Sequence, residues 1–290
     1  MVNGTPRPSR PPGGVHVSST SQSAQGAARQ ARNHPAVRTL ARAGYAASGL
    51  LHLIIGWLAV QLAFGSSSGQ ADSSGAMQQV SQAPGGEILL WAATVGFAAL
   101  GLWELTEAII GVPGVSDKKE AGARVKAAGK GILYAVLAFT AGQYATGSGS
   151  GGGGNKEESL TASVMGAPGG VLLVGAVGLT VIGVGIYHIY KGATKKFLED
   201  LRGTGGGTVG NAVVRLGQVG YIAKGIALGV LGGLFVAAAV THDADQAGGM
   251  EEALTTVREQ PFGVALLVVL GVGIAAYGVY SFARARYAKL

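Results

Sequence analysis

Six long apolar segments limit the folds open to this chain more than any other feature. They cover roughly residues 44–65, 86–110, 127–146, 169–190, 213–241 and 262–283. Each has about 20 residues or more, which is enough for an α-helix to cross a hydrocarbon core of about 30 Å. The third segment is the least apolar because it contains Thr140, Gln143 and Tyr144. The segments predict an all-α, polytopic membrane protein with six transmembrane helices.

One motif opens and closes each even-numbered segment. A proline is followed two residues later by a glycine, and seventeen residues after the proline comes a second glycine, then an aliphatic and an aromatic residue. The opening residues are Pro84 and Gly86, Pro168 and Gly170, and Pro261 and Gly263, and the closing residues are Gly101 and Trp103, Gly185 and Tyr187, and Gly278 and Tyr280. Three occurrences at one spacing indicate a tandem repeat.

The odd-numbered segments repeat as well. Ser48-Gly49-Leu50 aligns with Lys130-Gly131-Ile132 and with Lys224-Gly225-Ile226. Gly44-Tyr45 aligns with Gly220-Tyr221, whereas the second copy lacks this pair. The repeat therefore includes both helices of a hairpin.

A short stretch before each opening proline has apolar residues at helical spacing. In the first copy they are Met77 and Val80, and in the third they are Leu254 and Val257. Thr161 and Val164 occupy these positions in the second copy. The pattern predicts a short amphipathic helix on the membrane surface in each repeat.

These features divide the chain into four parts. Residues 1–36 are rich in Ser, Pro, Gly and Ala without apolar periodicity, which predicts a disordered cytoplasmic tail. Repeats follow over 37–112, 113–200 and 201–290, each with two transmembrane helices. Because each repeat has two spans, all three enter the membrane in the same direction. We therefore expect parallel repeats in a pseudo-threefold arrangement about the membrane normal.

The charges are distributed unevenly between the two sides of this arrangement. Lys and Arg lie in the tail, in the connections between repeats, within the cytoplasmic helix ends and after the last segment, and only Lys156 and Arg258 fall within the hairpin loops. The positive-inside rule then places both termini in the cytoplasm of a plasma-membrane protein. The basic face is expected to attract anionic lipids. The net charge of +7 follows from this topology and requires no nucleic-acid partner.

The motifs resemble those of a bacterial membrane family, best represented in actinobacteria. Its members carry three tandem copies of a two-helix transmembrane domain of unknown function. The resemblance rests on the Pro-x-Gly opening, the Gly-aliphatic-aromatic closing motif and the Gly-containing motif of the odd-numbered segments, and it covers about residues 37–287. It implies the six-helix fold and brings no assigned activity.

The residue after the closing aromatic is polar in all three copies. These residues are Glu104, His188 and Ser281, at equivalent depth. Ionisable groups inside a membrane are costly, so each is a functional candidate. Under pseudo-threefold symmetry, Glu104 and His188 are expected to face each other across the bundle axis, where they can pass protons or bind a cation. The alternative is that both are hydrated at the interface and pair with basic residues.

Other polar residues in the segments have simpler interpretations. His52 lies near mid-membrane and is expected to bond to a carbonyl of a neighbouring helix rather than to ligate haem. Lys130 and Lys224 are interpreted as snorkelling to the headgroups. The four-residue spacing of Gly225, Gly229 and Gly233 favours internal helix packing over dimerisation.

No motif indicates catalysis. The chain has no cysteine, which excludes disulfides and thiolate chemistry, and it contains no Ser-His-Asp set, zinc-ligand spacing or dinucleotide fingerprint. The sequence His242-Asp243-Ala244-Asp245 is weak evidence for a metal. We therefore predict no catalytic residue, metal or cofactor. The hypotheses are a non-enzymatic structural or accessory membrane protein, a small transporter using the Glu104/His188 layer, and an anionic-lipid-binding module.

Overall fold

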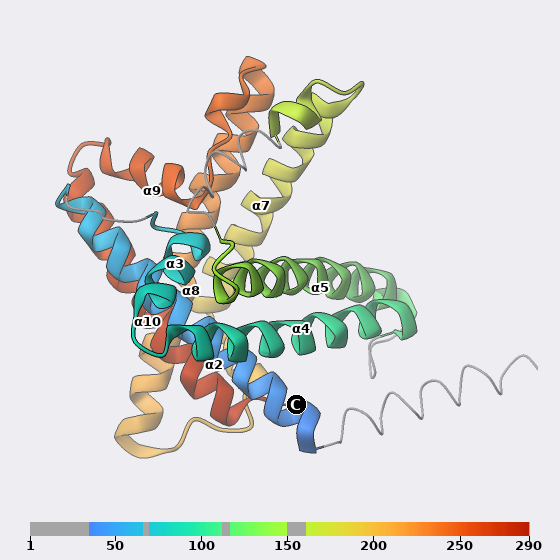
Figure 1. The fold of residues 1–290 in the computed structure, drawn as a ribbon, viewed down its shortest axis with the longest axis vertical. Helices are drawn as coiled ribbons and strands as arrows, with labels where there is room; N and C mark the ends of the chain where they lie inside the picture. Colours follow the sequence, from blue (N-terminus) through green and yellow to red (C-terminus); the bar gives the residue numbers. More distant parts are fainter. Residues whose placement is uncertain (1–34, 66–69, 112–116, 150–160, 290) are drawn as a thin grey trace, which may run out of the picture.

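A computed structural model describes residues 35–65, 70–111, 117–149 and 161–289 of the chain (Figure 1). The predicted tail, residues 1–36, lies outside this range except for its last two residues, which are helical. The described part is almost wholly helical. Its long helices are α2 (Pro35–Ala63), α4 (Gly86–Ile110), α5 (Asp117–Ala145), α7 (Gly170–Ala193), α8 (Gly207–Thr241) and α10 (Gly263–Tyr287). Its short helices are α3 (Ser73–Gln82), η1 (Lys196–Asp200), η2 (Ala244–Gln246) and α9 (Met250–Arg258).

Five of the long helices are long and apolar enough to cross a membrane: α2, α4, α7, α8 and α10. Their outer faces are apolar. Leu172 is 81% exposed and Ile109 is 76% exposed, which suits contact with lipid and not with water. Helix α5 covers the predicted third span, but it is not among the five. Its first half carries Glu120, Arg124 and Lys126, so charge extends well into this helix.

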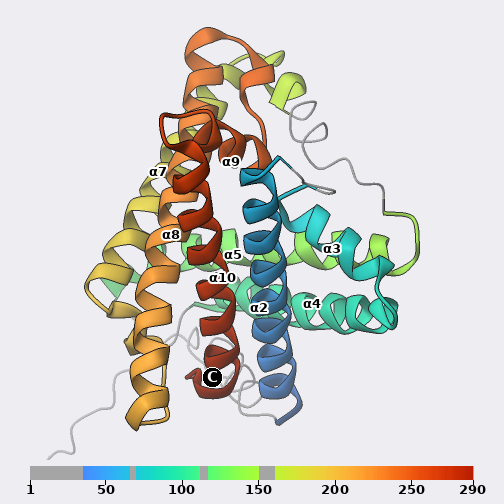
Figure 2. The same ribbon diagram turned by 90° about the vertical axis from the view of Figure 1, so that its left-hand side faces the viewer.

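The long helices pair in cyclic order through the repeats. The second helix of each repeat packs along the first helix of the next, so that α4 lies against α5 and α7 against α8. The cycle closes because α10, the last helix, packs along α2, the first described one. These three pairs make the most extensive contacts between elements. Figure 2 shows α2 and α10 side by side, although most of the chain separates them.

Glycines at matching positions bring the paired helices into backbone contact. A Cβ atom added to the closing-motif Gly185 would lie 2.7 Å from the carbonyl oxygen of Gly225, and one added to Gly278 would lie 2.8 Å from that of Gly49. In the α4–α5 pair the equivalent distance, from Gly101 to Gly131, is 3.3 Å. The closing glycine of each repeat thus packs on the odd-segment glycine of the next.

A second crossing point lies seven residues from the first in two of the pairs. A Cβ on Gly178 would lie 2.8 Å from the carbonyl oxygen of Gly232. A Cβ on Gly271 would lie 2.8 Å from the carbonyl oxygen of Gly56, and one on Gly56 would lie 2.6 Å from that of Gly271. A seven-residue spacing keeps one stripe of a helix facing its partner along a left-handed crossing. Gly233, in contrast, would place its Cβ in open space. Glycines at heptad spacing therefore form much of this interface.

The Pro-x-Gly motif forms a tight turn between each surface helix and the helix that follows. Gly85 and Gly169 have φ of +74° and +78°, and Phe262 occupies the same position with φ of +62°. This is the third position of a type II turn, with proline before it. The next residue is glycine because a Cβ on Gly86 would collide with the carbonyl oxygen of Val80.

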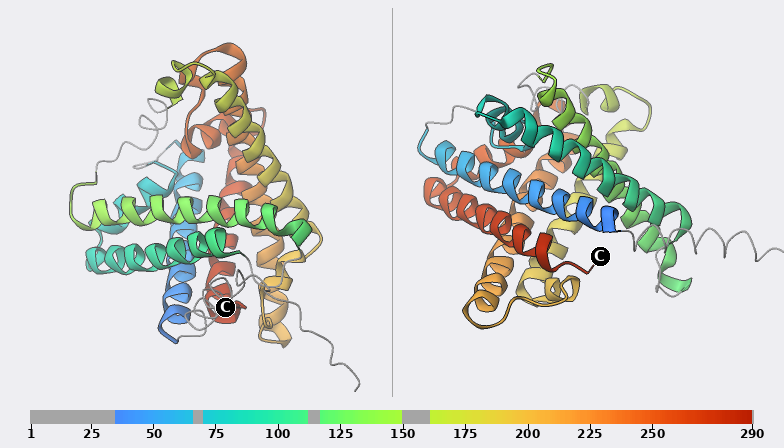
Figure 3. Two further views of the ribbon diagram at one scale, coloured as in Figure 1. Left: turned by 90° about the vertical axis from the view of Figure 1, so that its right-hand side faces the viewer. Right: turned by 60° about the horizontal axis from the view of Figure 1, so that its bottom comes forward.

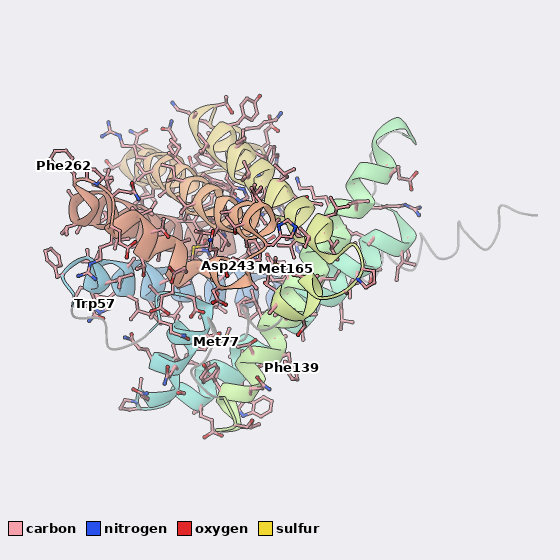
Figure 4. All side chains as sticks on the ribbon, turned by 90° about the horizontal axis from the view of Figure 1, so that it is seen from above. Trp57, Met77, Phe139, Met165, Asp243 and Phe262 are labelled. Atoms are coloured by element: carbon pink, nitrogen blue, oxygen red, sulfur yellow. The ribbon has the colours of Figure 1, made fainter. Side chains whose placement is uncertain are left out.

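The predicted surface helices of the first and third repeats are present as α3 and α9, and residues 161–165 are helical at the corresponding place in the second repeat. Helices α3 and α9 bury the predicted apolar residues. Met77 and Leu254 are fully buried in the main core, and Val80 joins them. Figure 4 shows Phe262 and Trp57 at the outer edge of the molecule, where both are exposed. The amphipathic pattern therefore predicted correctly which face of α3 and of α9 is buried.

The repeats differ in how their own two helices meet. Helix α2 packs against α4, and α8 packs against α10, but α5 makes at most marginal contact with α7. Figures 2 and 3 show α4 and α5 lying together across the direction of α2 and α10. The pairing order is therefore regular, while the α4–α5 pair departs from the orientation of the others.

One end of the bundle is tied together by the C-terminus. Leu201, just after η1, forms an isolated antiparallel bridge with Ala288. Arg202 N donates to Tyr287 O at 2.8 Å, and Lys289 N donates to Asp200 O at 3.0 Å. The connection between α7 and α8 and the end of α10 therefore lie at the same end of the molecule. We refer to residues 191–202 and 280–289 as the C-terminal junction.

Candidate functional site

The polar layer predicted after the closing motif lies at the interfaces between paired helices. Glu104 on α4 is buried, and its carboxylate accepts from Lys130 Nζ on α5 at 2.9 and 3.2 Å. The side chain of Lys130 is 45% exposed, against 10% for Glu104. The pair therefore joins two repeats at a half-open position, where solvent screening limits the energy of the ion pair.

The same register places Lys224 opposite His188 in the α7–α8 pair. Lys224 Nζ instead reaches across to α2, where it lies 2.9 Å from His52 Nε2. His52 Nδ1 lies 2.7 Å from the carbonyl oxygen of Ser48 in its own helix. Since that carbonyl only accepts, Nδ1 carries the proton, and Nε2 is free to accept from the lysine. His52 is therefore a neutral acceptor for Lys224.

Aromatic rings complete the surroundings of Lys224. Its Nζ lies 4.5 Å from the ring centroid of Tyr277, which also contacts the His52 ring at 4.8 Å. Such a cation–π contact is worth about 2 kcal/mol when it is desolvated. The amine thus has a ring face and an imidazole as partners, and the contacts bring α2, α8 and α10 together.

His188 and Ser281 make local contacts. His188 Nδ1 lies 2.8 Å from Val184 O, and its ring packs 5.6 Å from that of Tyr221. Ser281 is buried and donates to Tyr277 O at 2.8 Å. Both hydrogen bonds stay within one helix. Neither residue has a bond to Glu104 among the described residues.

A second polar group lies at the C-terminal junction. Lys191 Nζ binds Asp200 Oδ2 at 2.6 Å, and Arg284 Nη2 lies 3.9 Å from the same oxygen. The Arg284 guanidinium also lies over the Tyr45 ring at 4.5 Å. Tyr280 Oη and Arg284 Nε are buried and have no hydrogen-bond partner in the described structure. One carboxylate therefore serves two cations here.

The structure rearranges the predicted site. Glu104 pairs with Lys130 instead of facing His188, so the layer is divided between helix pairs. His52 is packed as expected, but the carbonyl it bonds to belongs to Ser48 of its own helix, and its partner on a neighbouring helix is Lys224. The interpretation of Lys130 and Lys224 as snorkelling missed their partners, because each partner lies in another repeat. Trp103 and Tyr187 lie about two turns before the ends of α4 and α7. Tyr187 is 39% exposed, which suits a position at the membrane–water interface.

Comparison with known proteins bears on this repeat. A family model described as Domain of Unknown Function (DUF1206) matches three times, over residues 43–111, 125–195 and 219–288. The chain belongs to the DUF1206 family. Each match contains an opening and a closing motif and most of the two long helices of one repeat. The family assignment therefore confirms the tandem repeat, and with the apolar helices it identifies a multi-pass membrane protein of unknown function.

The chain is also similar to a curated protein. This relative is the Bacillus subtilis (strain 168) "Uncharacterized protein YxxB", which is 28% identical over 255 residues, covering 87% of this chain and 92% of the relative. No solved structure matches the chain. The bacterial relative agrees with the resemblance to a bacterial membrane family, and its printed name assigns no activity.

Proposed function

We propose that this DUF1206 protein is a non-enzymatic structural or accessory protein of the plasma membrane, with six spans and both termini in the cytoplasm. The observation that carries the proposal is the way its intramembrane polar groups are used. Glu104 with Lys130, and Lys224 with His52, join helices of different repeats. Such pairs resist separation in lipid, where unpaired polar groups are costly. They suit a role in holding a bundle together.

Two features support α5 as the sixth span, although the α4–α5 pair lies across the direction of α2 and α10. Helix α5 is continuous from Asp117 to Ala145, long enough to cross the bilayer even though its start is charged. It also meets α4 through Gly131 and Gly101, the same motif positions at which the other two pairs meet. Glycine contact of this kind is typical of helices packed within a membrane.

The charge distribution supports the orientation. The connection between α7 and α8 carries Lys195, Lys196 and Arg202, and the C-terminus carries Arg286 and Lys289. By the positive-inside rule this end faces the cytoplasm, where anionic lipids are the expected partners.

Single-cysteine labelling tests the topology directly, because the natural chain has no cysteine. We expect Ser81→Cys and Ser148→Cys to react with a membrane-impermeant maleimide in intact cells, and Gly203→Cys to react only after permeabilisation. If α5 does not cross, Ser148→Cys is protected while Gly203→Cys is labelled from outside, and the six-span topology is wrong.

The structural role is tested by purification of the protein from native membranes in a mild detergent, with bound proteins identified. A reproducible partner set, lost when the tagged chain is solubilised harshly, supports an accessory role. A chain that purifies alone and carries out solute flux by itself contradicts it.

Transport is a second candidate, favoured by the contact between Lys224 and His52. A lysine amine bonded to a neutral imidazole inside a membrane is a group that can exchange a proton. Proteoliposomes with a pH-sensitive dye inside test this by comparing the wild type with Lys224→Met and Glu104→Gln. Flux that Lys224→Met abolishes supports transport, whereas no flux, or equal flux in all three, excludes this pair as a proton path.

A further inference from the structure

Cations outnumber carboxylates at the C-terminal junction. Lys191 and Arg284 share the single carboxylate group of Asp200. The exposed residues around them are mostly basic: Lys195, Lys196, Arg202, Arg286 and Lys289. Glu199 is the other acid of the junction. Its backbone carbonyl accepts a hydrogen bond from Lys289 Nζ at 2.8 Å. The junction thus retains a positive excess after its internal pairs are formed.

Arg284 is a partly buried cation whose donors are incompletely paired among the described residues. A guanidinium has five N–H donors in a planar fork. Its nearest carboxylate oxygen, Asp200 Oδ2, lies 3.9 Å away, which is too long for a hydrogen bond, and its buried Nε has no partner in the described structure. Lys191 holds that carboxylate instead, at 2.6 Å. The side chain of Arg284 is nevertheless 21% exposed, so a ligand can approach it from outside.

The bundle surface at the level of Arg284 fits a lipid better than a small dissolved anion. On other faces of the helices, at about the depth of Arg284, Phe282 and Val279 on α10 are 40% and 43% exposed, and Tyr190 on α7 is 50% exposed. Lys196 Nζ lies 5.6 Å from the centroid of the Tyr190 ring. Basic side chains beside exposed aromatic and aliphatic ones are typical of the level at which headgroups meet acyl chains.

From these observations we infer that the C-terminal junction binds the phosphate group of an anionic phospholipid, with the Arg284 guanidinium as its principal ligand. The phosphate oxygens supply acceptors to the exposed part of the guanidinium, in the bidentate geometry that arginine favours. Asp200 competes with the phosphate for Arg284 and Lys191. The inference goes beyond the proposed structural role, and it rests on that proposal only in placing this end at a membrane surface.

Lipid retention by the full-length protein tests the inference. The purified chain is placed in nanodiscs of phosphatidylcholine with or without phosphatidylglycerol, re-extracted into detergent, and analysed for bound phosphatidylglycerol by mass spectrometry. We expect Arg284→Gln to lower the affinity about tenfold or more, since charge-assisted hydrogen bonds are lost. Asp200→Asn removes the competing carboxylate and should raise the affinity, an effect that misfolding cannot produce.

Two matched variants act as controls. Arg258→Gln makes the same change of charge in α9, at the other end of the molecule, and should leave binding unchanged. Arg215→Gln removes an exposed charge on the same side from α8, and should have a much smaller effect than Arg284→Gln. Equal losses in Arg215→Gln and Arg284→Gln would indicate a diffuse basic surface and overturn the inference.

The source of the phosphate is tested separately. Inorganic phosphate added as a competitor should displace the phospholipid only weakly, because it lacks the apolar contacts. Displacement at concentrations comparable to those of the lipid would assign the junction to a free phosphate instead. The cysteine label at Gly203 reports the topology independently, so a failed lipid test and a failed topology can be told apart.

Discussion

The residue between the proline and the glycine of each opening motif has a left-handed backbone. Gly169 meets this requirement without strain, and a Cβ added to it would touch nothing. We predict that Gly169→Ala lowers stability by roughly 1 kcal/mol, the cost of the left-handed conformation for a residue with a side chain. The thermal unfolding midpoint in detergent measures this. Gly233→Ala, in open space within α8, is the control and should not destabilise.

The ion pair of Glu104 and Lys130 gives a second prediction at this scale. Because Glu104 is buried and Lys130 is half exposed, the coupling energy should fall between that of surface pairs and that of buried ones, about 1–2 kcal/mol. A double-mutant cycle of Glu104→Gln and Lys130→Met, followed by thermal unfolding, measures it. Additive effects of the two substitutions would mean that the pair contributes nothing to stability.

Individual residues were predicted unevenly from the sequence. The apolar faces of α3 and α9 could be predicted, since they depend on residue spacing within one helix. The partners of Lys130 and Lys224 could not, because they lie 26 and 172 residues away. Aligning the repeats marks equivalent positions, but it does not show which helices touch.

At the scale of elements, the heptad-spaced glycines decide which helix faces pair. Gly185 faces the backbone of Gly225, whereas Gly183, two residues earlier on α7, faces open space. Gly185→Val should therefore destabilise the protein by about 1–3 kcal/mol through overpacking, and Gly183→Val should have little effect. The midpoint of unfolding in detergent distinguishes them. Equal effects would mean that the α7–α8 crossing does not lie at Gly185.

The heptad spacing of these glycines is visible in the amino-acid sequence itself. The pairs Gly49 and Gly56, Gly178 and Gly185, Gly225 and Gly232, and Gly271 and Gly278 all have a spacing of seven. The four-residue spacing of Gly225, Gly229 and Gly233 also indicates internal packing, but Gly233 makes no such contact. Hydropathy alone is enough to place the helices along the chain. Their contact faces follow only from the heptad spacing.

The surface helices give a prediction about pH. Burial raises the pKa of Asp72, the N-cap of α3, against the opposing hydrogen bond from Gly75 N at 2.7 Å. Burial also raises the pKa of Glu251, with further contributions from Asp72 and Glu252. An acid whose folded-state pKa is raised stabilises the fold below its unfolded pKa, and that stability is lost as the pH rises through the folded-state pKa.

The unfolding midpoint should therefore fall as the pH rises from about 4 towards neutral. Asp72→Asn removes one titrating group while keeping an N-cap side chain, so it should flatten this dependence. Glu259→Gln, an exposed change of the same charge, should leave the dependence as in the wild type. The prediction fails if the wild-type midpoint is constant, or rises, over that range.

At the scale of the whole molecule, the sequence predicted three repeats, and the structure shows that helix pairs between successive repeats join them in a cycle. Hydropathy and motif spacing gave the all-α class and the approximate positions of the helices. The predicted segment 86–110 coincides with α4, whereas α2 and α5 begin at Pro35 and Asp117, well before the predicted residues 44 and 127. Neither property identifies a helix partner, so a hairpin within each repeat was the natural expectation. The closest pairs instead connect successive repeats, and α10 returns to α2. The most extensive helix contacts therefore follow the pairing of motifs between repeats and not the pairing of helices within one repeat.

Cyclic packing predicts that the chain tolerates a break between α7 and α8. Residues 1–203 and 204–290, expressed together as separate chains, should assemble, because the α7–α8 and α10–α2 pairs both cross the break. A tag on the shorter chain should then recover the longer one from solubilised membranes. Gly185→Val together with Gly278→Val removes both crossings and should abolish recovery, while Gly183→Val should not. If the two chains fail to co-purify although each inserts into the membrane, neither the α7–α8 pair nor the α10–α2 pair holds the bundle together.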